Sequence, residues 1–423
     1  MTMRDVIALI MAGGKGERLY PLTQDRSKPS VPYGGIYRII DVTLSNCINS
    51  NIYKIIVLPQ YKAQSLVEHL EAGWNIFSYA LGHYLKVVHP QMRTGDQWYQ
   101  GTADSVRQNL YLIQRESPEH VLILSGDHVY KMDYGRLKAY HREKDADITV
   151  SVIEIPISEG HRFGVLGVDQ DYRITGFQEK PPAATAIPGD PDHALASMGI
   201  YMFKTRTLVD LLKSSDRDDF GMDIIPEALE RYSLFAFPYK KENRIEDFVY
   251  TMAEDGSRLR ILEPCVQDSS YWRDVGDLDA YWNANMDLTG VEPMFNLYGT
   301  KWPLRTFQAQ YPPVKTVFKN KSANRIGMAL DSIVSHGTII SGGVVKNSVL
   351  SYNVTVRSWS EVRESVIMSD VEIGRHCRIM KAIIDKKNII PPNTAIGYDP
   401  EEDRKRFTVT PRGIVVVGKG TFT

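Results

Sequence analysis

A glycine-rich loop with basic side chains follows a fully apolar run near the start of the chain. Three glycines stand within four positions directly after Met11-Ala12, and an arginine and a lysine follow. Glycine lets a backbone approach a ligand closely with its N–H groups aimed at an anion, and nearby cations add positive charge. The residues that could hold a phosphate-bearing ligand are therefore Gly13, Gly14, Gly16, Arg18 and Lys28.

The loop completes neither of two familiar phosphate-binding motifs. A Walker A loop needs Lys-Ser or Lys-Thr after its last glycine, whereas Gly16 is followed by Glu17-Arg18. A dinucleotide fingerprint needs a glycine where Leu19 stands. A plain glycine turn with solvated charges therefore stays open as an alternative at this point.

A carboxylate with metal-binding chemistry follows a second apolar run. Asp127 comes after Val121–Leu124 and the pair Ser125-Gly126. Ligands of parallel sheets sit at the carboxyl ends of the strands, so Asp127 and the glycine loop are expected at the same edge. Asp127 could bind Mg²⁺, which takes one or two carboxylates besides phosphate oxygens, or it could cap a turn or helix.

The first 290 residues alternate short apolar runs with amphipathic stretches. The runs predict strands of a mostly parallel sheet, and the stretches predict helices that wrap it, in an α/β domain of the Rossmann-like kind. The predicted strands lie at residues 6–11, 54–58, 86–88 and 121–124, and the predicted helices at 62–72 and 101–115. A proline-punctuated linker is expected over 291–322.

The last segment, residues 323–423, contains aliphatic residues at spacings of five and six. Neither an α-helix nor a simple strand has this period, but a parallel β-helix with one inward aliphatic residue per face does. The inward positions are Ile339, Val345, Leu350, Val356, Val362, Ile367, Ile373, Ile379, Ile384, Ile390 and Ile396. A chance arrangement stays open, and some β-helices are acyltransferases, so the repeat alone assigns no function.

Composition excludes several classes of protein. The chain has 423 residues, enough for two or three domains, and 50 Lys+Arg against 51 Asp+Glu argue against nucleic-acid binding through a basic field. Three widely spaced cysteines favour a reducing compartment over a disulfide framework. The apolar run near the N-terminus is too short for a membrane span and has no leader features, so a cytoplasmic protein is expected.

Longer strings resemble the sugar-phosphate nucleotidylyltransferases. The glycine loop with Lys28-Pro29 is one string, and the others occupy residues 97–104, 125–130, 177–181, 196–201 and 271–276. The strings GDHVYKMDY, SMGIY and YWRDVG resemble specifically the glucose-1-phosphate adenylyltransferases. This resemblance covers nearly the whole chain and implies a catalytic domain over 1–290 followed by a left-handed parallel β-helix.

The resemblance implies a reaction and a set of contacts. ATP and glucose 1-phosphate would give ADP-glucose and pyrophosphate, for glycogen synthesis. Arg18 would bind the β- and γ-phosphates of ATP, Lys28 the α-phosphate region, and Asp127 and Asp274 the Mg²⁺. Backbone groups of the three loop glycines would face the nucleotide, and Gly101 would lie against adenine.

The same resemblance assigns the sugar-phosphate side of the site. Lys180 would bind the phosphate of glucose 1-phosphate and Glu179 the sugar hydroxyls, with further contacts from Tyr99, Gly164 and Ser197. His128 is expected to be structural, because the attacking phosphate is already anionic and needs no general base.

The family also implies regulation and assembly. An inter-domain anion site would contain Arg26, Arg38, Arg115 and Lys386, and it would bind AMP, ADP or phosphate as inhibitors. Lys386 stands where enteric-type members have arginine, and Asp25 where they have a lysine that serves a bisphosphate activator. The acidic Asp25 favours a less charged activator, fructose 6-phosphate or pyruvate, and the assembly is expected to be a homotetramer.

Three alternatives follow from the same residues. Another nucleotidylyltransferase, using UTP, GTP or dTTP, would share the loop and the aspartates. A non-catalytic regulatory subunit would have lost a phosphate-binding cation or a metal-binding aspartate, and none is missing here. An acetyltransferase built on the β-helix is the weakest alternative, because no substrate motif accompanies the repeat.

Overall fold

The computed structural model describes residues 2–91, 98–320 and 325–423. Within these ranges no helix is both long enough and apolar enough to cross a bilayer. Gln97, the first residue of one family string, lies outside the described residues.

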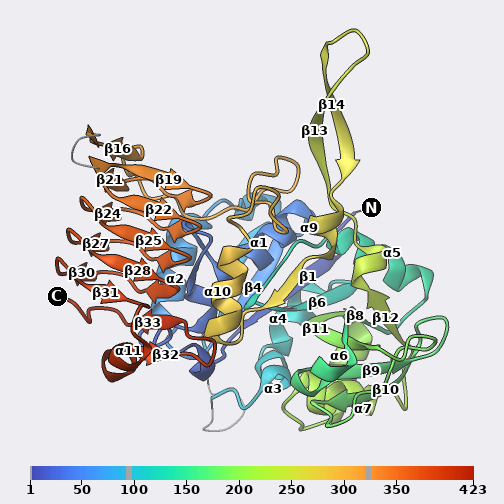
Figure 1. Cartoon of the computed structure of the whole chain (residues 1–423). Coiled ribbons are helices and arrows are strands. Elements are labelled where there is room, and N and C mark those ends of the chain that lie inside the picture. The colour runs from blue at the N-terminus through green and yellow to red at the C-terminus, as the bar shows by residue number, and fades with distance from the viewer. Residues whose placement is uncertain (1, 92–97, 321–324) are drawn as a thin grey trace.

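A nine-stranded mixed sheet forms the centre of the catalytic domain (Figure 1). Its parallel half is β6-β1-β4-β5, in which the apolar runs of the sequence lie side by side. These strands are β1 (Val6–Ala12), β4 (Lys54–Pro59), β5 (Tyr84–Val87) and β6 (His120–Ser125). The other half has largely antiparallel pairs and consists of β8 (Ile148–Pro156), β9 (Gly164–Val168), β10 (Ile174–Glu179), β11 (His193–Lys204) and β12 (Leu234–Pro238).

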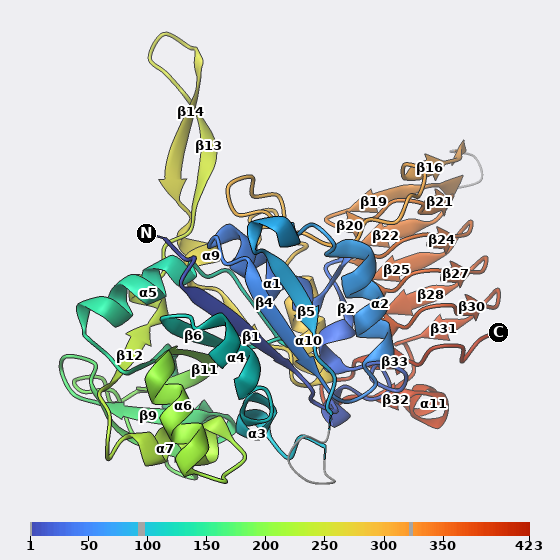
Figure 2. The same cartoon turned by 180° about the vertical axis from the view of Figure 1, so that it is seen from behind.

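Helices cover both faces of this sheet (Figures 1 and 2). Alternate side chains of β1 point to opposite faces, so that Val6 and Ile10 enter one core and Ile7 and Leu9 the other. The first face is covered by α1 (Ile39–Asn49), α2 (Gln64–Gly73), α5 (Tyr134–Glu143) and α10 (Leu278–Met286). The second is covered by α3 (Thr102–Arg107), α4 (Leu110–Glu116), α6 (Thr205–Ser214) and α7 (Ile225–Ala228).

The helix expected over 101–115 is in fact two helices, α3 and α4. The break lies at Asn109, whose side-chain amide donates to the Ser105 carbonyl at 2.8 Å and to the Tyr99 hydroxyl at 2.8 Å. An asparagine side chain that bonds its own backbone competes with helical hydrogen bonding, which accounts for the interruption.

Short elements complete the domain. Two small pairs are β2 (Pro32–Tyr33) with β3 (Tyr37–Arg38) and β7 (His128–Tyr130) with β15 (Trp272–Asp274). The hairpin of β13 (Glu246–Met252) and β14 (Arg258–Pro264) projects as an arm from the body, between α8 (Tyr239–Glu242) and α9 (Val266–Ser270) (Figures 1 and 2).

The C-terminal domain is a parallel β-helix with three sheets, as the repeat predicts (Figure 1). The first sheet contains β16 (Lys315–Val317), β21 (Ile339–Ser341), β24 (Thr355–Val356), β27 (Glu372–Ile373) and β30 (Ile389–Ile390). The second contains β19 (Met328–Leu330), β22 (Val344–Lys346), β25 (Glu361–Arg363), β28 (Arg378–Met380) and β31 (Ala395–Ile396). The third contains β20 (Ile333–Val334), β23 (Val349–Leu350), β26 (Val366–Ile367), β29 (Ala382–Ile384), β33 (Val415–Val417) and the antiparallel β32 (Thr408–Val409). Helix α11 (Pro400–Arg406) and a small pair, β17 (Lys319–Asn320) with β18 (Arg325–Ile326), flank the coils.

All predicted inward positions are buried except the first one. Ile339 is 40% exposed, and its neighbour Ile340 is fully buried and pairs in register with Val356 of the next coil. The prediction for Ile339 is therefore wrong by one residue, because register with the coil below decides which side chain points inward.

The β-helix begins earlier than residue 323 and packs tightly on the catalytic domain. Strand β16, inside the segment expected to be linker, already pairs with β21. Buried side chains of both domains belong to one core, and the Trp282 indole N–H donates to the Glu364 carbonyl at 2.8 Å across the junction. The two domains are therefore one packed body.

Candidate active site

The glycine loop leaves β1 at the carboxyl edge of the sheet and folds back on itself. Gly16 has φ +65°, and a Cβ there would lie 3.0 Å from Thr23 Cγ2 and 3.1 Å from Lys28 Cβ. Glycine at this position therefore allows Lys28 to pack directly against the loop. A Cβ on Gly14 would meet no atom within 4 Å, so that part of the loop is open to a ligand.

A cavity of about 280 Å³ lies between this loop and the ends of β1, β4 and β6. Its wall brings together predicted site residues that are far apart in sequence, including Tyr99 from the predicted sugar-phosphate set. They are Gly13, Gly14, Lys28, Tyr99, Gly101 and Asp127. The end of the sheet is therefore hollowed where the loop, a lysine and an aspartate meet.

Glycine is required at position 101 because the backbone at Asp218 passes very close to it. A Cβ at this position would lie 2.3 Å from the Asp218 carbonyl oxygen, so any side chain would clash with backbone. The next residue, Thr102, donates from its hydroxyl to the Asp219 carboxylate at 3.1 Å. These contacts hold the start of α3 against the loop that precedes α7, on the wall of the cavity.

The pairing of β7 with β15 brings the two predicted metal-binding aspartates together. Asp274 lies opposite His128 in this antiparallel register, and Asp127 directly precedes His128. Asp127 follows Gly126, where a Cβ would lie 3.0 Å from Ile10 Cγ2, so the chain passes tightly over β1. The Ser125 hydroxyl donates to the Asp127 carboxylate and orients it.

Lys28 bridges both aspartates. Its Nζ lies 2.8 Å from Asp127 Oδ2 and 3.1 Å from Asp274 Oδ1, and the residue is 7% exposed. Burial alone would lower the pKa of the Lys28 ammonium, but the two carboxylates outweigh burial and raise it. Burial alone would raise the pKa of Asp127, but the Lys28 ammonium holds it well below its usual range. Lys28 and Asp127 are therefore charged at neutral pH, and the two carboxyl groups present the oxygen donors that Mg²⁺ prefers.

His128, which is expected to be structural, lies beside the acidic pair. Its Nε2 is 3.6 Å from Asp127 Oδ1 and 3.9 Å from Asp274 Oδ1, and its ring packs edge-on against Trp272 at 5.2 Å. Its buried Nδ1 has no hydrogen-bond partner among the described residues. His128 thus supports the carboxylates from the side of the aromatic wall.

Arg18 is exposed and points toward the aspartate loop. A Cβ on Gly276 would lie 2.8 Å from Arg18 Nη2 and 2.8 Å from Asp274 Oδ2. Within the part of the chain that is described, the Arg18 guanidinium forms no ion pair, so it remains available to a ligand. Glycine at 276 keeps space between the guanidinium and the carboxylate.

Three of the predicted sugar-phosphate residues, Gly164, Glu179 and Lys180, meet where the end of β10 lies beside the start of β9. Glu179 pairs in register with Gly164, where a Cβ would lie 2.5 Å from Phe177 Cζ and 3.0 Å from Glu179 Oε2. Lys180 has φ +43°, and its exposed Nζ lies 2.8 Å from Glu179 Oε1. The absence of a side chain at Gly164 leaves room for Glu179 to hold Lys180.

Ser197 lies at an irregularity of β11 beside Ser125 and His128. The register of β11 shifts between Ser197 and Tyr201, and the Ser197 hydroxyl accepts the Gly199 N–H at 3.3 Å. A Cβ on Gly199 would contact Ser125 and the His128 ring at 3.6 and 3.7 Å. Tyr99 lies elsewhere: it is buried on the nucleotide-side wall, with its hydroxyl on Asn109.

Three of the four predicted regulatory cations gather at the junction of the domains. Arg26 forms a buried ion pair with Asp385, next to Lys386 in the β-helix. Burial and the charges of Arg26 and Arg38 lower the pKa of Lys386 to about 8. Burial lowers the pKa of Arg38 to about 10, although the charge of the nearby Asp41 acts in the opposite direction.

Arg115 does not lie with the other three predicted regulatory cations of the same chain. It lies in the last turn of α4, which covers the sheet face opposite α1 and the β-helix, and its Nη2 lies 3.8 Å from Glu116 Oε1. Helical periodicity could not say which face of the sheet α4 would cover.

Gln60 is a site residue that sequence reasoning missed. It follows β4, lines the cavity, and donates from Nε2 to the Tyr99 carbonyl at 2.8 Å. Its side chain also lies against Gly13, where a Cβ would be 3.1 Å from Gln60 Cβ. Asp127 was predicted because ligands of parallel sheets sit at the carboxyl ends of the strands. The same reasoning applies to Gln60 at the end of β4.

Comparison with known proteins identifies the family of the chain. The sequence profile described as Nucleotidyl transferase matches residues 7–290, and the one described as GlmU-like, C-terminal hexapeptide matches residues 312–417. A protein of Methylococcus capsulatus named glucose-1-phosphate adenylyltransferase is 50% identical over 419 residues, covering 98% of this chain and 93% of that protein. Proteins with the same name from Rhodopirellula baltica and Nitrosococcus oceani are each 49% identical, covering 99% and 98% of this chain and 91% and 94% of theirs. The chain therefore belongs to the glucose-1-phosphate adenylyltransferase family of nucleotidyl transferases.

Proposed function

We propose that this protein transfers AMP from ATP to glucose 1-phosphate, giving ADP-glucose and pyrophosphate. The observation that supports this most directly is the Lys28 ammonium between the carboxylates of Asp127 and Asp274 at the mouth of the glycine-loop cavity. Two polyanionic substrates can meet only where cations offset their charge, and this site supplies such cations.

In the proposed reaction an oxygen of the sugar phosphate attacks the α-phosphorus of ATP in line. The new O–Pα bond forms as the bond from Pα to the oxygen bridging to the β-phosphorus breaks, and pyrophosphate leaves with that electron pair. Lys28 stabilises negative charge at the α-phosphate, and Arg18 binds the departing phosphates. Lys180, held by Glu179, binds the phosphate of the attacking sugar.

Mg²⁺ is the metal that the aspartate pair fits. Asp127 and Asp274 would hold it by carboxylate oxygens, the donors that this ion prefers. When bound, it would neutralise charge on the nucleotide phosphates. His128 stays beside the pair.

The test is pyrophosphate release from glucose 1-phosphate with Mg²⁺ and a panel of nucleotides. Turnover is expected with ATP and much slower with UTP, GTP or dTTP. A clear preference for another nucleotide would replace this proposal with a different nucleotidylyltransferase. A folded protein without turnover for any nucleotide would support the regulatory-subunit alternative.

The cations at the domain junction are proposed to bind anionic effectors. Arg26, Arg38 and Lys386 are the proposed contacts for AMP, ADP or phosphate, and Arg115 is not placed with them in one chain. Asp25 forms an ion pair of 2.9 Å with Lys419, so the positive charge of Lys419 is already partly neutralised. That pair supports a singly phosphorylated or carboxylate activator, fructose 6-phosphate or pyruvate, over a bisphosphate.

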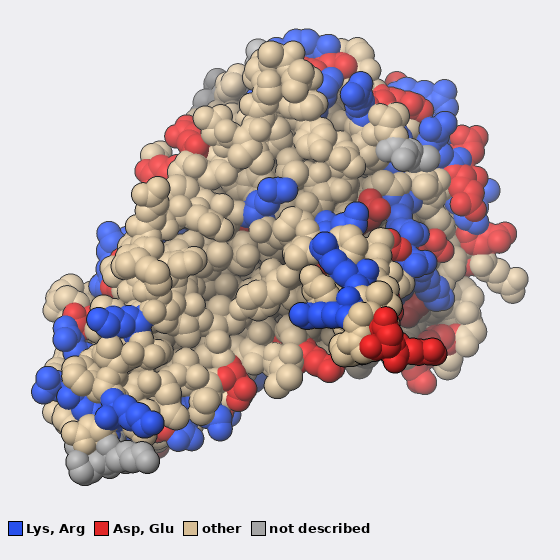
Figure 3. Space-filling view, turned by 90° about the horizontal axis from the view of Figure 1, so that it is seen from above, with Lys and Arg blue, Asp and Glu red and all other residues tan. Residues whose placement is uncertain are grey.

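The proposed assembly is a cytoplasmic homotetramer that serves glycogen synthesis. Apolar side chains on the outside of the β-helix support subunit contacts there, since Leu330, Ile339 and Ile389 are 46, 40 and 55% exposed. The face seen from above also has a broad area with few charged side chains (Figure 3). Contacts between subunits would cover such surfaces.

A further inference from the structure

Residues 218–221 join the two substrate sides of the candidate active site. On the nucleotide-side wall of the cavity, the Asp218 carbonyl accepts the Ala103 N–H at 2.7 Å. On the other side the segment reaches a predicted sugar-phosphate residue, because a Cβ on Gly221 would lie 3.6 Å from Glu179 Oε2. One short stretch of chain therefore touches both halves of the site.

The Thr102 hydroxyl, on the wall of the cavity, holds this segment at two points. It donates to Asp219 Oδ2 at 3.1 Å and accepts the Phe220 N–H at 2.9 Å. Asp219 in turn caps the short helical turn that follows, since its Oδ1 accepts the N–H groups of Gly221 at 2.8 Å and Met222 at 3.0 Å. A single hydroxyl group therefore fixes the turn whose glycine lies against Glu179.

Phe220 extends the connection to Ser197, another of the predicted sugar-phosphate residues. The Phe220 side chain is 1% exposed, and its ring centroid lies 5.9 Å from that of Tyr201. The Tyr201 hydroxyl lies 3.4 Å from the Ser197 hydroxyl. Close-packed interiors transmit a displacement from one side chain to the next. A shift of Phe220 would therefore be felt at Ser197 as well as at Glu179.

Loss of the Thr102 hydroxyl would remove a partner from Asp219 Oδ2 and from the Phe220 N–H. A polar group left without its partner costs more free energy than the hydrogen bond itself contributes. Residues 218–221 would reduce that cost by moving toward water, since Asp216 and Arg217, which precede them, are exposed. The expected result is a displaced segment rather than an unfolded domain.

We propose that Thr102 is a positioning residue for the sugar phosphate, although it stands on the nucleotide-side wall. Its hydroxyl holds residues 218–221 where they support Glu179, and Glu179 holds Lys180. The inference rests on the proposed function, because it takes Lys180 as the contact for glucose 1-phosphate. Thr102 acts through the segment and needs no contact of its own with the sugar phosphate.

Initial-rate kinetics of Thr102→Val over both substrate concentrations test the proposal. The KM for glucose 1-phosphate should rise by about fivefold or more, as expected for a lost hydrogen bond, and the KM for ATP should change less. Thr102→Ser keeps the hydroxyl and should retain most of the wild-type KM. Thr289→Val is the matched control: it removes a half-buried hydroxyl that donates to the Met286 carbonyl at 2.9 Å, and it should change neither KM.

The kinetic outcomes separate this inference from the proposed function. A rise in the KM for ATP equal to or larger than that for glucose 1-phosphate would make Thr102 a local contact of the nucleotide. A fall in kcat with both KM values unchanged would show a loss of folded enzyme and no positioning role. If the wild type turns over and Thr102→Val behaves as Thr289→Val does, this inference fails and the proposed function stands.

Hydrogen exchange measured by mass spectrometry tests the same link without any substrate. Peptides that cover residues 218–224 should exchange faster in Thr102→Val than in the wild type, because local opening becomes easier when a hydrogen bond is removed. Thr102→Ser should restore the slower exchange. Unchanged exchange of these peptides would refute the positioning role, whichever nucleotide the protein uses.

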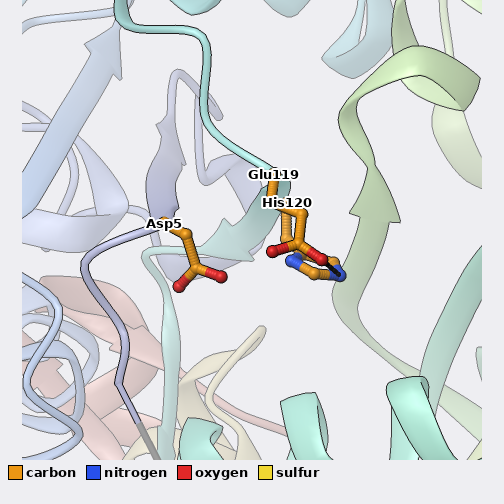
Figure 4. Close-up of side chains that lie close together, drawn as sticks. All are labelled: Asp5, Glu119 and His120. Atoms are coloured by element: carbon orange, nitrogen blue, oxygen red, sulfur yellow. Dashed lines mark ion pairs between the residues drawn. The ribbon is translucent and has the colours of Figure 1, made fainter.

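The far end of β6 supplies the internal reference for this measurement. Asp5, Glu119 and His120 lie close together there, and His120 begins the strand whose other end faces the active site (Figure 4). Lys138 Nζ donates to both Asp5 oxygens, at 2.5 and 2.7 Å, so this cluster is held independently of Thr102. Its peptides should exchange equally in all the variants. Faster exchange there as well would indicate a destabilised fold and overturn the proposal.

Discussion

Asp274 lies directly opposite His128 in the antiparallel pairing of β15 with β7. Because Asp127 directly precedes His128, this single register brings both aspartates within reach of the Lys28 ammonium. A shift of β15 by one residue would turn the Asp274 side chain to the other side of the strand. The acidic pair therefore depends on a three-residue strand.

The aspartate pair yields the first prediction. Asp127→Asn or Asp274→Asn removes a charge that Mg²⁺ needs, and a loss of several kcal/mol corresponds to a fall in kcat of at least about 100-fold. Pyrophosphate release measures kcat, and circular dichroism checks the fold. Asp216→Asn, on an exposed loop, is the matched control and should retain wild-type turnover. Near-normal turnover of a folded Asp127→Asn variant would contradict the metal-binding role.

Lys180 is predicted to act on one substrate only. Loss of a charge-assisted hydrogen bond costs about 1.5–3 kcal/mol, so Lys180→Ala should raise the KM for glucose 1-phosphate by about tenfold or more. The KM for ATP should change little, and initial rates over both substrate concentrations measure the two values. Lys213→Ala, another exposed lysine, should change neither. Equal increases for both substrates would rule out a selective sugar-phosphate contact.

Arg38 is predicted to affect regulation rather than chemistry. Arg38→Ala should weaken inhibition by AMP or phosphate by about fivefold or more and leave basal turnover mostly intact, because an effector site biases a conformational equilibrium. Arg38 also donates to the Ser65 carbonyl and hydroxyl, at 2.5 and 2.9 Å. Ser65→Ala removes the hydroxyl contact but not the charge, so it should keep full sensitivity. An Arg38→Ala variant as inactive as Asp127→Asn would place Arg38 in the active site instead.

The effector response is also predicted to depend on pH through Lys386. Its pKa of about 8 in the folded protein means that it is charged at pH 7 and mostly neutral at pH 9. AMP, whose phosphate is already doubly ionised above pH 7, should therefore bind more weakly as pH rises from 7.5 to 9. Lys386→Arg keeps its charge throughout this range and should lose most of that dependence. Identical pH profiles for the two proteins would show that Lys386 does not contact the effector.

Sedimentation tests the proposed assembly. The apolar side chains outside the β-helix should be covered in a homotetramer, and charged substitutions at Ile389 and Leu330 should shift the equilibrium toward smaller species. Analytical ultracentrifugation at micromolar concentration measures this shift. A wild-type monomer at that concentration would contradict the proposal.

Local pattern in the sequence was enough for the parallel half of the sheet and for most of the β-helix. Apolar runs such as Val121–Leu124 become buried strands because hydrophobic burial acts on each run regardless of its partners. The spacing of about six residues could not determine which residue of the first coil points inward. Ile340 rather than Ile339 points inward because it must stack on Val356, a partner that the local pattern does not specify.

The sequence by itself determined which side chains could do chemistry, because glycines, cations and carboxylates retain their chemical character in any fold. Only the tertiary structure decided which of them meet. Asp274 reaches Asp127 through a strand pairing distant in sequence, Lys28 enters between them, and Arg115 lies on the opposite face of the sheet from Lys386. These contacts depend on strand register and on the order of the layers in the whole fold. The spacing of residues along the sequence specifies neither.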